Sequence, residues 1–152
     1  MEVTYGKGFG LRASMPTRVL ALQEELAKLP QYEPITEHIF HGGMYCRQVW
    51  RQAGVTIVGK VHKKEHFYMV VSGTIIVTTD DGVKRITGPE LICSMPGTKR
   101  AVYSETDALC ITFHRVESTT VEAAEDELVE YDPRAMFTVG NKIKVQEIEV
   151  SL

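Results

Sequence analysis

The sequence predicts an all-β domain of the sandwich or barrel class, with helices only near its two ends. Short β-rich runs follow one another between residues 38 and 116, separated by turn residues, and this region has almost no helical periodicity. Regular short strands of this kind are typical of sandwiches and barrels. With 152 residues, 43% of them hydrophobic and 24% charged, the chain is long enough for one soluble domain with its own core.

Residues 1–37 are expected to form an N-terminal arm that contains a short helix. The apolar residues of this helix have helical spacing, at Val19, Leu22, Leu26 and Leu29. Pro16 is tolerated in a first helical turn, and Pro30 ends the run. Such an amphipathic stripe packs either on the chain's own barrel or on a neighbouring subunit, and the pattern is compatible with both.

Residues 38–116 are expected to form the barrel itself. The predicted strands are residues 44–50, 55–62, 67–71, 74–79, 83–86, 90–94, 101–103 and 108–116. Asp80-Asp81-Gly82 is a hairpin signal, and Ser72-Gly73 marks another tight reversal.

Residues 117–152 are expected to form a C-terminal helix followed by an extended tail. Thr119 and Glu122 have the spacing of a capping box, which predicts a helix that continues to about residue 130. Apolar and charged residues then alternate over residues 143–150, as in a half-buried edge strand. Because such terminal strands often pair with a neighbouring sheet, we expect the chain to form a homo-oligomer.

Charge and cysteine content limit the function classes. A net charge of −3 gives no reason to expect binding to nucleic acid or to a membrane. The three cysteines include no Cys-x-x-Cys pair, which favours reduced thiols and a cytoplasmic location. Residues 60–64 form a basic island although residues 122–132 are strongly acidic, so a local basic pocket can exist in this mildly acidic chain.

Two motifs carry a family resemblance. The segment from Gly59 to Gly73 and the later Met95-Pro-Gly-Thr-Lys-Arg100 resemble the two sequence motifs of the cupin superfamily. That resemblance implies a jelly-roll β-barrel, which in this family usually holds a metal ion on three histidines and a glutamate. The four ligand positions here are Lys60, His62, His66 and Arg100. Lysine and arginine at two of these positions cannot coordinate a metal ion and would repel one.

The candidate site follows from strand alternation and from the resemblance. Lys60 and His62 lie on one face of an extended strand, and the resemblance places that face inside the barrel. The expected ligand-binding residues are Lys60, His62, Lys99 and Arg100, with Tyr68 and Tyr103 as aromatic walls. His114 lies on the last barrel strand and could reach this pocket from the opposite wall.

Three interpretations of this set stay open. In the first, Arg100 forks onto a carboxylate or phosphate, Lys60 and Lys99 add charge, and His62 or His66 donates or titrates. In the second, His62, Glu65 and His66 hold a divalent transition metal. In the third, the charged residues pair with one another at a barrel rim and have a structural role only.

A narrower resemblance concerns origin. The residues Gly59-Lys-x-His-Lys-x-Glu-His66, Asp81-Gly-Val-Lys84 and Pro96-Gly-Thr-Lys-Arg100 are similar to small cupin-like proteins encoded by tailed bacteriophages. This implies a phage protein, either in the host cytoplasm or in the virion. The leading expectation is a non-catalytic protein without a cofactor that binds a small anion or assembles with protein partners. The alternatives are a metal-dependent cupin enzyme of the isomerase or oxygenase type, and a structural jelly roll that contacts other virion proteins.

Overall fold

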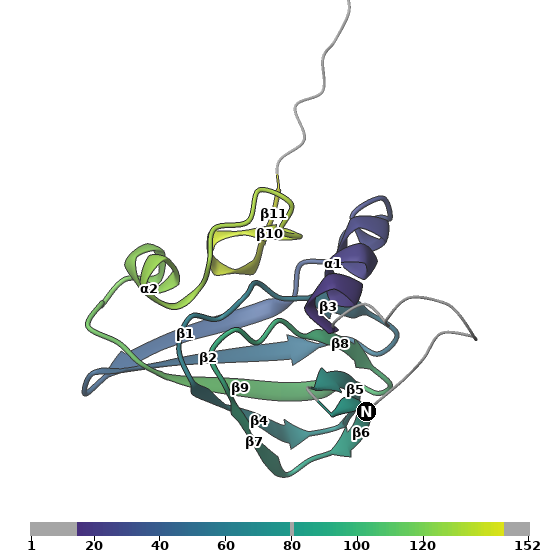
Figure 1. Cartoon of the computed structure of the whole chain (residues 1–152). Helices are drawn as coiled ribbons and strands as arrows, with labels where there is room; N and C mark the ends of the chain where they lie inside the picture. The colour runs from purple at the N-terminus through teal and green to yellow at the C-terminus, as the bar shows by residue number, and fades with distance from the viewer. Residues whose placement is uncertain (1–14, 80, 145–152) are drawn as a thin grey trace, which may run out of the picture.

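Two antiparallel sheets form the body of the protein in a computed structural model, which describes residues 15–79 and 81–144 (Figure 1). The five-stranded sheet has the order β1-β2-β9-β4-β7, with β1 Ile35–His41, β2 Met44–Arg51, β9 Ala108–Arg115, β4 His66–Ser72 and β7 Glu90–Ser94. The four-stranded sheet has the order β3-β8-β5-β6, with β3 Thr56–Val58, β8 Ala101–Ser104, β5 Thr74–Thr79 and β6 Gly82–Thr87. The predicted all-β class is thereby confirmed.

The main core lies between the two sheets. Its buried members are Tyr68, Val70, Ile75, Val77, Ile86, Val102, Ala108 and Cys110. Burial alternates along β4, where Tyr68 and Val70 are buried while Phe67 is exposed. This alternation follows from the two-residue period of a strand, and each aliphatic side chain buried in this way contributes about 1.5–3 kcal/mol.

The chain crosses from one sheet to the other at Gly73, between β4 and β5. Gly73 has a φ of +84°, and a Cβ atom placed there would lie 2.2 Å from the backbone oxygen of Asp107. Only glycine fits such a left-handed and crowded corner. The reversal predicted at Ser72-Gly73 therefore joins the two layers of the barrel.

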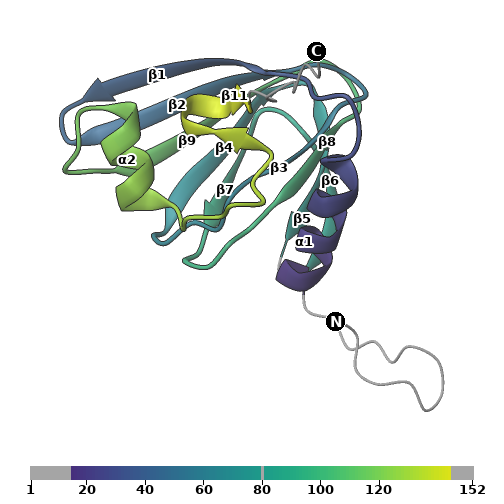
Figure 2. The same ribbon diagram turned by 90° about the horizontal axis from the view of Figure 1, so that it is seen from above.

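Helix α1, Met15–Leu26, lies beside β3 (Figures 1 and 2). Val19 is buried in a second cluster with Val58 and Phe137, and Leu26 packs against that cluster. Leu22 and Leu29 are exposed. The helix ends before Leu29, so only part of the predicted apolar stripe is used, and that part packs on the chain's own barrel.

Helix α2, Val121–Leu128, packs beside the start of β2 and the end of β9. Its N-cap is Thr120 rather than the predicted Thr119, because the Thr120 hydroxyl accepts a hydrogen bond from the backbone of Ala123. Ala124 and Leu128 pack against Tyr45 on β2. A small hairpin follows, formed by β10 Phe137–Thr138, the 3₁₀ helix η1 Val139–Asn141 and β11 Lys142–Ile143. The predicted tail strand falls mostly on residues 145–152, which lie outside the described residues.

Two strand predictions differ from the structure. β1 was not expected, and β3 covers only Thr56–Val58 of the predicted 55–62. After β3 the chain is irregular. His62 forms an isolated bridge with Val129, and its backbone also hydrogen-bonds to Gly97 and Thr98. Among the described residues, no helix is long and apolar enough to cross a membrane.

Candidate functional site

A cavity of about 90 Å³ lies inside the barrel and is lined by cations. Its polar walls are Arg47, Arg51, Lys60, His62, His66, Tyr68, Thr112, Asn141 and Arg100. Four of these side chains are lysine or arginine, and none of the described lining residues is a carboxylate. The positions that the sequence assigned to metal ligands, Lys60, His62, His66 and Arg100, all line this one cavity.

Strand β2 supplies two of the cations because of its alternation. Tyr45, Arg47, Val49 and Arg51 follow one another at intervals of two residues, and Tyr45 and Val49 are buried. Side chains on one strand face share one environment, so the two arginines also point into the barrel. We did not identify either arginine from the sequence, although the pattern Tyr-x-Arg-x-Val-x-Arg contained the signal.

Glu125 on α2 neutralises two of the four cations. Its carboxylate lies 3.3 Å from Arg47 Nη2 and 3.3 Å from Lys60 Nζ, with only 7% of the side chain exposed. It also accepts a hydrogen bond from the backbone of Gly140. Lys60 is thus held in a buried ion pair, and Glu125 ties α2 and the C-terminal hairpin to the barrel wall.

Arg51 has no such partner. Its Nε and Nη1 atoms are buried and make no hydrogen bond with any described residue. The Tyr68 hydroxyl is also buried without a partner. Tyr68 and the Cys110 thiol lie near the guanidinium, but the Arg51 Nε and Nη1 atoms and the Tyr68 hydroxyl make no hydrogen bond of good geometry within the described part of the chain. Burial raises the pKa of Tyr68, so its hydroxyl stays protonated and can donate.

Arg100 connects the two sheets above this cavity. Its Nη1 donates to Thr78 O at 3.2 Å, and its Nη2 donates to Ser94 Oγ at 2.7 Å. The guanidinium carbon lies 5.8 Å from the centre of the Tyr68 ring. Arg100 is therefore held in place while still lining the cavity.

Three histidines form a cluster in which His62 and His66 line the cavity and His114 lies beside them. The ring centres of His62 and His66 lie 4.3 Å apart, and those of His66 and His114 lie 4.6 Å apart. Burial, reinforced by neighbouring rings and Arg47, lowers the pKa of His62 to about 3 and that of His114 to about 2. Burial also lowers the pKa of His66. All three imidazoles are therefore neutral near pH 7, so donating hydrogen bonds, rather than titrating there, is the role left to His62 and His66.

These histidines do not form a metal site as arranged. His66 Nδ1 lies 3.2 Å from the Lys64 carbonyl, and His114 Nε2 lies 2.8 Å from the Thr112 hydroxyl. Glu65 is exposed at a surface hollow beside His66 and His114, whereas His62 lines the interior cavity. Across residues 15–79 and 81–144, no group of three or more His, Cys, Asp or Glu side chains is placed to hold a metal ion. The residues at the positions that the resemblance assigns to metal ligands therefore do not fit a divalent metal ion.

Lys99 and Tyr103 lie apart from the interior cavity. Lys99 is 7% exposed, donates to Gly59 O at 3.0 Å and lies 3.6 Å from Asp132. Tyr103 is exposed on the outer side of β8. The structure thus brings together Lys60, His62, Tyr68 and Arg100 from the predicted ligand-binding set, but not these two residues.

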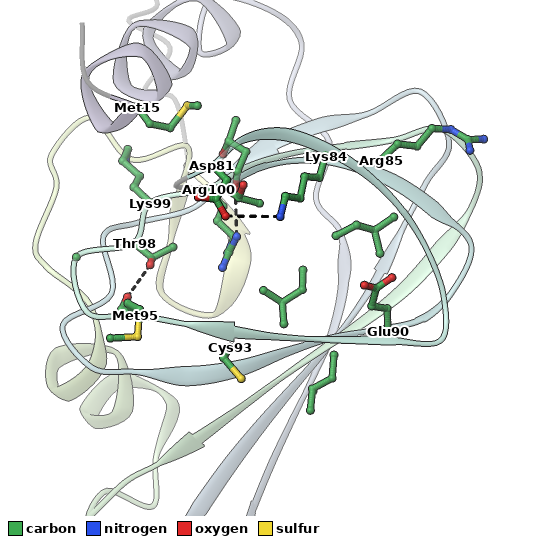
Figure 3. A pocket seen from close by; sticks show the side chains of 16 residues that line it. Met15, Asp81, Lys84, Arg85, Glu90, Cys93, Met95, Thr98, Lys99 and Arg100 are labelled. Atoms are coloured by element: carbon green, nitrogen blue, oxygen red, sulfur yellow. Dashed lines mark hydrogen bonds and ion pairs between the residues drawn. The ribbon is translucent and has the colours of Figure 1, made fainter. Parts of the chain in front are cut away.

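A second, open groove of about 600 Å³ lies between the β5–β6 hairpin, β7 and the segment before β8 (Figure 3). Two of its cations already have acidic partners. Lys84 Nζ lies 3.7 Å from Asp81, and Arg85 forms a 2.7 Å ion pair with Glu105. Lys99, which also lines the groove, lies 3.6 Å from Asp132. Arg100 is the one described cation that lines both the groove and the interior cavity.

Comparisons with known proteins agree with this architecture. Neither a protein-family model nor a curated protein matches the sequence. Among solved structures, ectoine synthase from P. lautus aligns over 67% of this chain and 78% of its own, with 11% identity and a TM-score of 0.52. The plu4264 protein from Photorhabdus luminescens aligns over 65% and 88%, with 12% identity and a TM-score of 0.51. A cupin superfamily protein from Desulfitobacterium hafniense DCB-2 aligns over 62% and 87%, with 8% identity and a TM-score of 0.49.

The fold is a cupin-like jelly roll. At these identities the likeness shows the fold alone and leaves the activity to be argued from the site. Within this cupin-like barrel, guanidinium and hydroxyl groups are the main polar groups around the interior cavity.

Proposed function

We propose that the protein binds a small anion inside the barrel and that it acts as a binding protein rather than as a catalyst. The observation that carries this proposal is the buried Arg51 guanidinium, whose Nε and Nη1 have no partner among the described residues. The Tyr68 hydroxyl, a second buried donor without a partner, lines the same cavity. A carboxylate or phosphoryl group could accept hydrogen bonds from both.

Energetics support an anionic ligand. A buried donor without an acceptor costs about 1–3 kcal/mol, while a charge-assisted hydrogen bond contributes about 1.5–3 kcal/mol. Glu125 compensates Arg47 and Lys60, whereas the Arg51 guanidinium, which lines the same cavity, has two buried N–H groups without a partner among the described residues. An anion near Arg51 would offset a buried charge and satisfy its donors together.

Cavity size supports a small ligand. A volume of about 90 Å³ has room for several water molecules or for one group such as phosphate, acetate or oxalate. A nucleotide or sugar phosphate is too large for the interior unless most of it projects outward. The proposed ligand class is therefore a free anion with one or two acid groups.

Calorimetric titration with phosphate, sulfate, acetate and oxalate tests the proposal. We expect saturable binding of at least one of them to the parent protein, and on the order of tenfold or more weaker binding to Arg51→Met. The matched control is Arg85→Met, which removes an exposed arginine paired with Glu105 and should leave binding unchanged. No saturable binding, or equal losses in both variants, would contradict the proposal.

The metal-dependent enzyme, the phage origin and the virion role that the sequence suggested stay predictions. A metal-dependent cupin enzyme is the alternative that the motif resemblance favours, and elemental analysis of the purified protein distinguishes it. Finding one tightly bound transition-metal ion per chain would favour the metal-dependent enzyme over the anion-binding protein. A phage origin, and with it a virion role, rests only on the narrower sequence resemblance.

A further inference from the structure

The outer face of the five-stranded sheet is apolar across neighbouring strands. Phe113 on β9 lies opposite Phe67 on β4, and Ile111 lies opposite Met69 in the next row. Met69 in turn lies opposite Leu91 on β7. Directly opposed residues of an antiparallel pair lie about 4.5–5.5 Å apart, so these five side chains form one continuous patch, called here the apolar face.

The described part of the chain leaves this face open to solvent. Phe67 is 49% exposed and Leu91 is 53% exposed. Helices α1 and α2 and the β10–β11 hairpin lie on the opposite side of the sheet (Figures 1 and 2). Continuous apolar patches of this kind are uncommon on monomeric proteins and mark contact surfaces.

The size of the face suits a second copy of the chain. The sheet has five strands, and β1 and β2 have 7 and 8 residues. The row that contains Phe67 and Phe113 continues across the sheet, because Phe113 lies opposite Cys46 on β2 and Cys46 lies opposite Ile39 on β1. With a strand spacing of about 4.8 Å and a rise of about 3.3 Å per residue, the plane of the whole sheet covers roughly 600 Å². Side-chain relief increases the accessible area, which brings it near the roughly 800 Å² per partner of a stable protein interface.

The charge pattern also suits a copy of itself. The apolar face carries no charge, and charged residues lie at its rim, with Glu65 and Arg115 of opposite sign at one end and Glu37 on the edge strand β1. An apolar centre with a polar rim is the usual anatomy of an interface. An anionic lipid surface would need a basic rim instead, whereas this rim has two carboxylates and one guanidinium.

We infer that two copies of this chain pack against each other through the apolar face in a symmetric dimer. In a twofold interface the same patch serves both subunits, so one such face per chain is sufficient. This differs from assembly through the N-terminal helix and the tail, which the sequence suggested. The inference does not rest on anion binding, because the face lies on the outside of the sheet and the cavity lies on the inside.

Sedimentation equilibrium with matched variants tests the inference. The parent should have twice the 17.1 kDa chain mass at micromolar concentration. Phe67→Lys and Leu91→Lys should each weaken self-association about a hundredfold or more, because every substitution enters a twofold interface twice. The control Val83→Lys changes a 61% exposed residue on the other sheet and should stay dimeric.

Alkylation of Cys93 gives a second, independent measurement. Cys93 is exposed and lies opposite Phe67 on the same face of the sheet. Its alkylation rate, followed by peptide mass spectrometry, should fall as parent concentration rises and should not change with concentration in Phe67→Lys. A parent that is monomeric at all concentrations, including one that binds vesicles or another protein instead, would overturn the inference. Dimeric lysine variants with a protected Cys93 would overturn it as well.

Discussion

Replacing Arg51 with methionine should stabilise the protein in the absence of anions and remove its response to them. Methionine keeps much of the length of the arginine side chain but removes the charge and the two buried donors without partners. Most substitutions of residues inside a barrel destabilise it. A gain in stability is therefore an unusual outcome, and it follows only if the Arg51 charge is uncompensated without a ligand.

The magnitude follows from the burial of Arg51. Replacing buried ionic groups by apolar residues of similar volume stabilises proteins by about 1–4 kcal/mol. For a chain of this size, roughly 3 °C per kcal/mol gives a rise in Tm of about 3–12 °C. A ligand at one hundred times its Kd adds about 2.7 kcal/mol to the parent and nothing to the variant. Saturating anion should therefore reduce or reverse the difference between the two proteins.

Differential scanning calorimetry measures both effects. The two proteins are compared in a zwitterionic buffer free of phosphate, sulfate and carboxylates, and then with each anion in turn. A variant that melts below the parent in the anion-free buffer, and that gains as much as the parent from added anion, would refute the reasoning. Arg51 would then be an ordinary packed side chain.

Three further predictions follow from the same cavity. Glu125→Gln should lower the free energy of unfolding, measured by urea denaturation, by about 3–5 kcal/mol, because it leaves two buried cations without a full countercharge. The control Glu105→Gln, at an exposed ion pair, should lower it by no more than about 1 kcal/mol. Arg100→Ala should weaken anion binding tenfold or more in calorimetric titration, and Lys84→Ala should leave it unchanged. Lowering the pH from 7 to 5 should reduce the free energy of unfolding by about 2 kcal/mol through His62. The pKa of about 3 keeps His62 neutral in the folded protein, whereas the same imidazole in the unfolded chain binds a proton below about pH 6.5. That stability is complete above pH 6.5 and is lost as the pH falls, so a His62→Gln variant that retains the full pH slope would contradict the assignment.

The barrel strands could be predicted where the sequence alternates in the usual sense, with apolar side chains directed inward. The predicted strands at 74–79 and 90–94 coincide with β5 and β7. Strand β1 could not be recognised in this way because both of its faces mix apolar and polar residues, with Glu37 exposed and Phe40 half-buried. Ile35 and Ile39 are exposed on the outer face, while Thr36 and His38 point toward the barrel interior. Exposed isoleucines on the outer face are unexpected for a monomer, and they support the dimer inferred above.

The candidate site could be predicted only in part, because its decisive pairings are remote in the sequence. Lys60 and Arg100 were found through family motifs, and both line the cavity. Glu125 lies 65 residues from Lys60 within an acidic run, so nothing local distinguished this buried carboxylate from its solvated neighbours. Arg51 at a strand end resembled a surface residue, and its burial depends on the sheet that closes over it.

The most direct test of anion binding is the NMR signal of the Arg51 Nε–H group during titration with phosphate, acetate and oxalate. Assignment is secured by the loss of this signal in Arg51→Met. The proposed site predicts a saturable downfield shift of the Nε proton and slower exchange with water as an anion accepts its hydrogen bond, while the Nε–H of exposed Arg85 changes little. An Arg51 signal that stays constant while Arg85 shifts with salt would show that anions reach only the surface, and would contradict the proposed function.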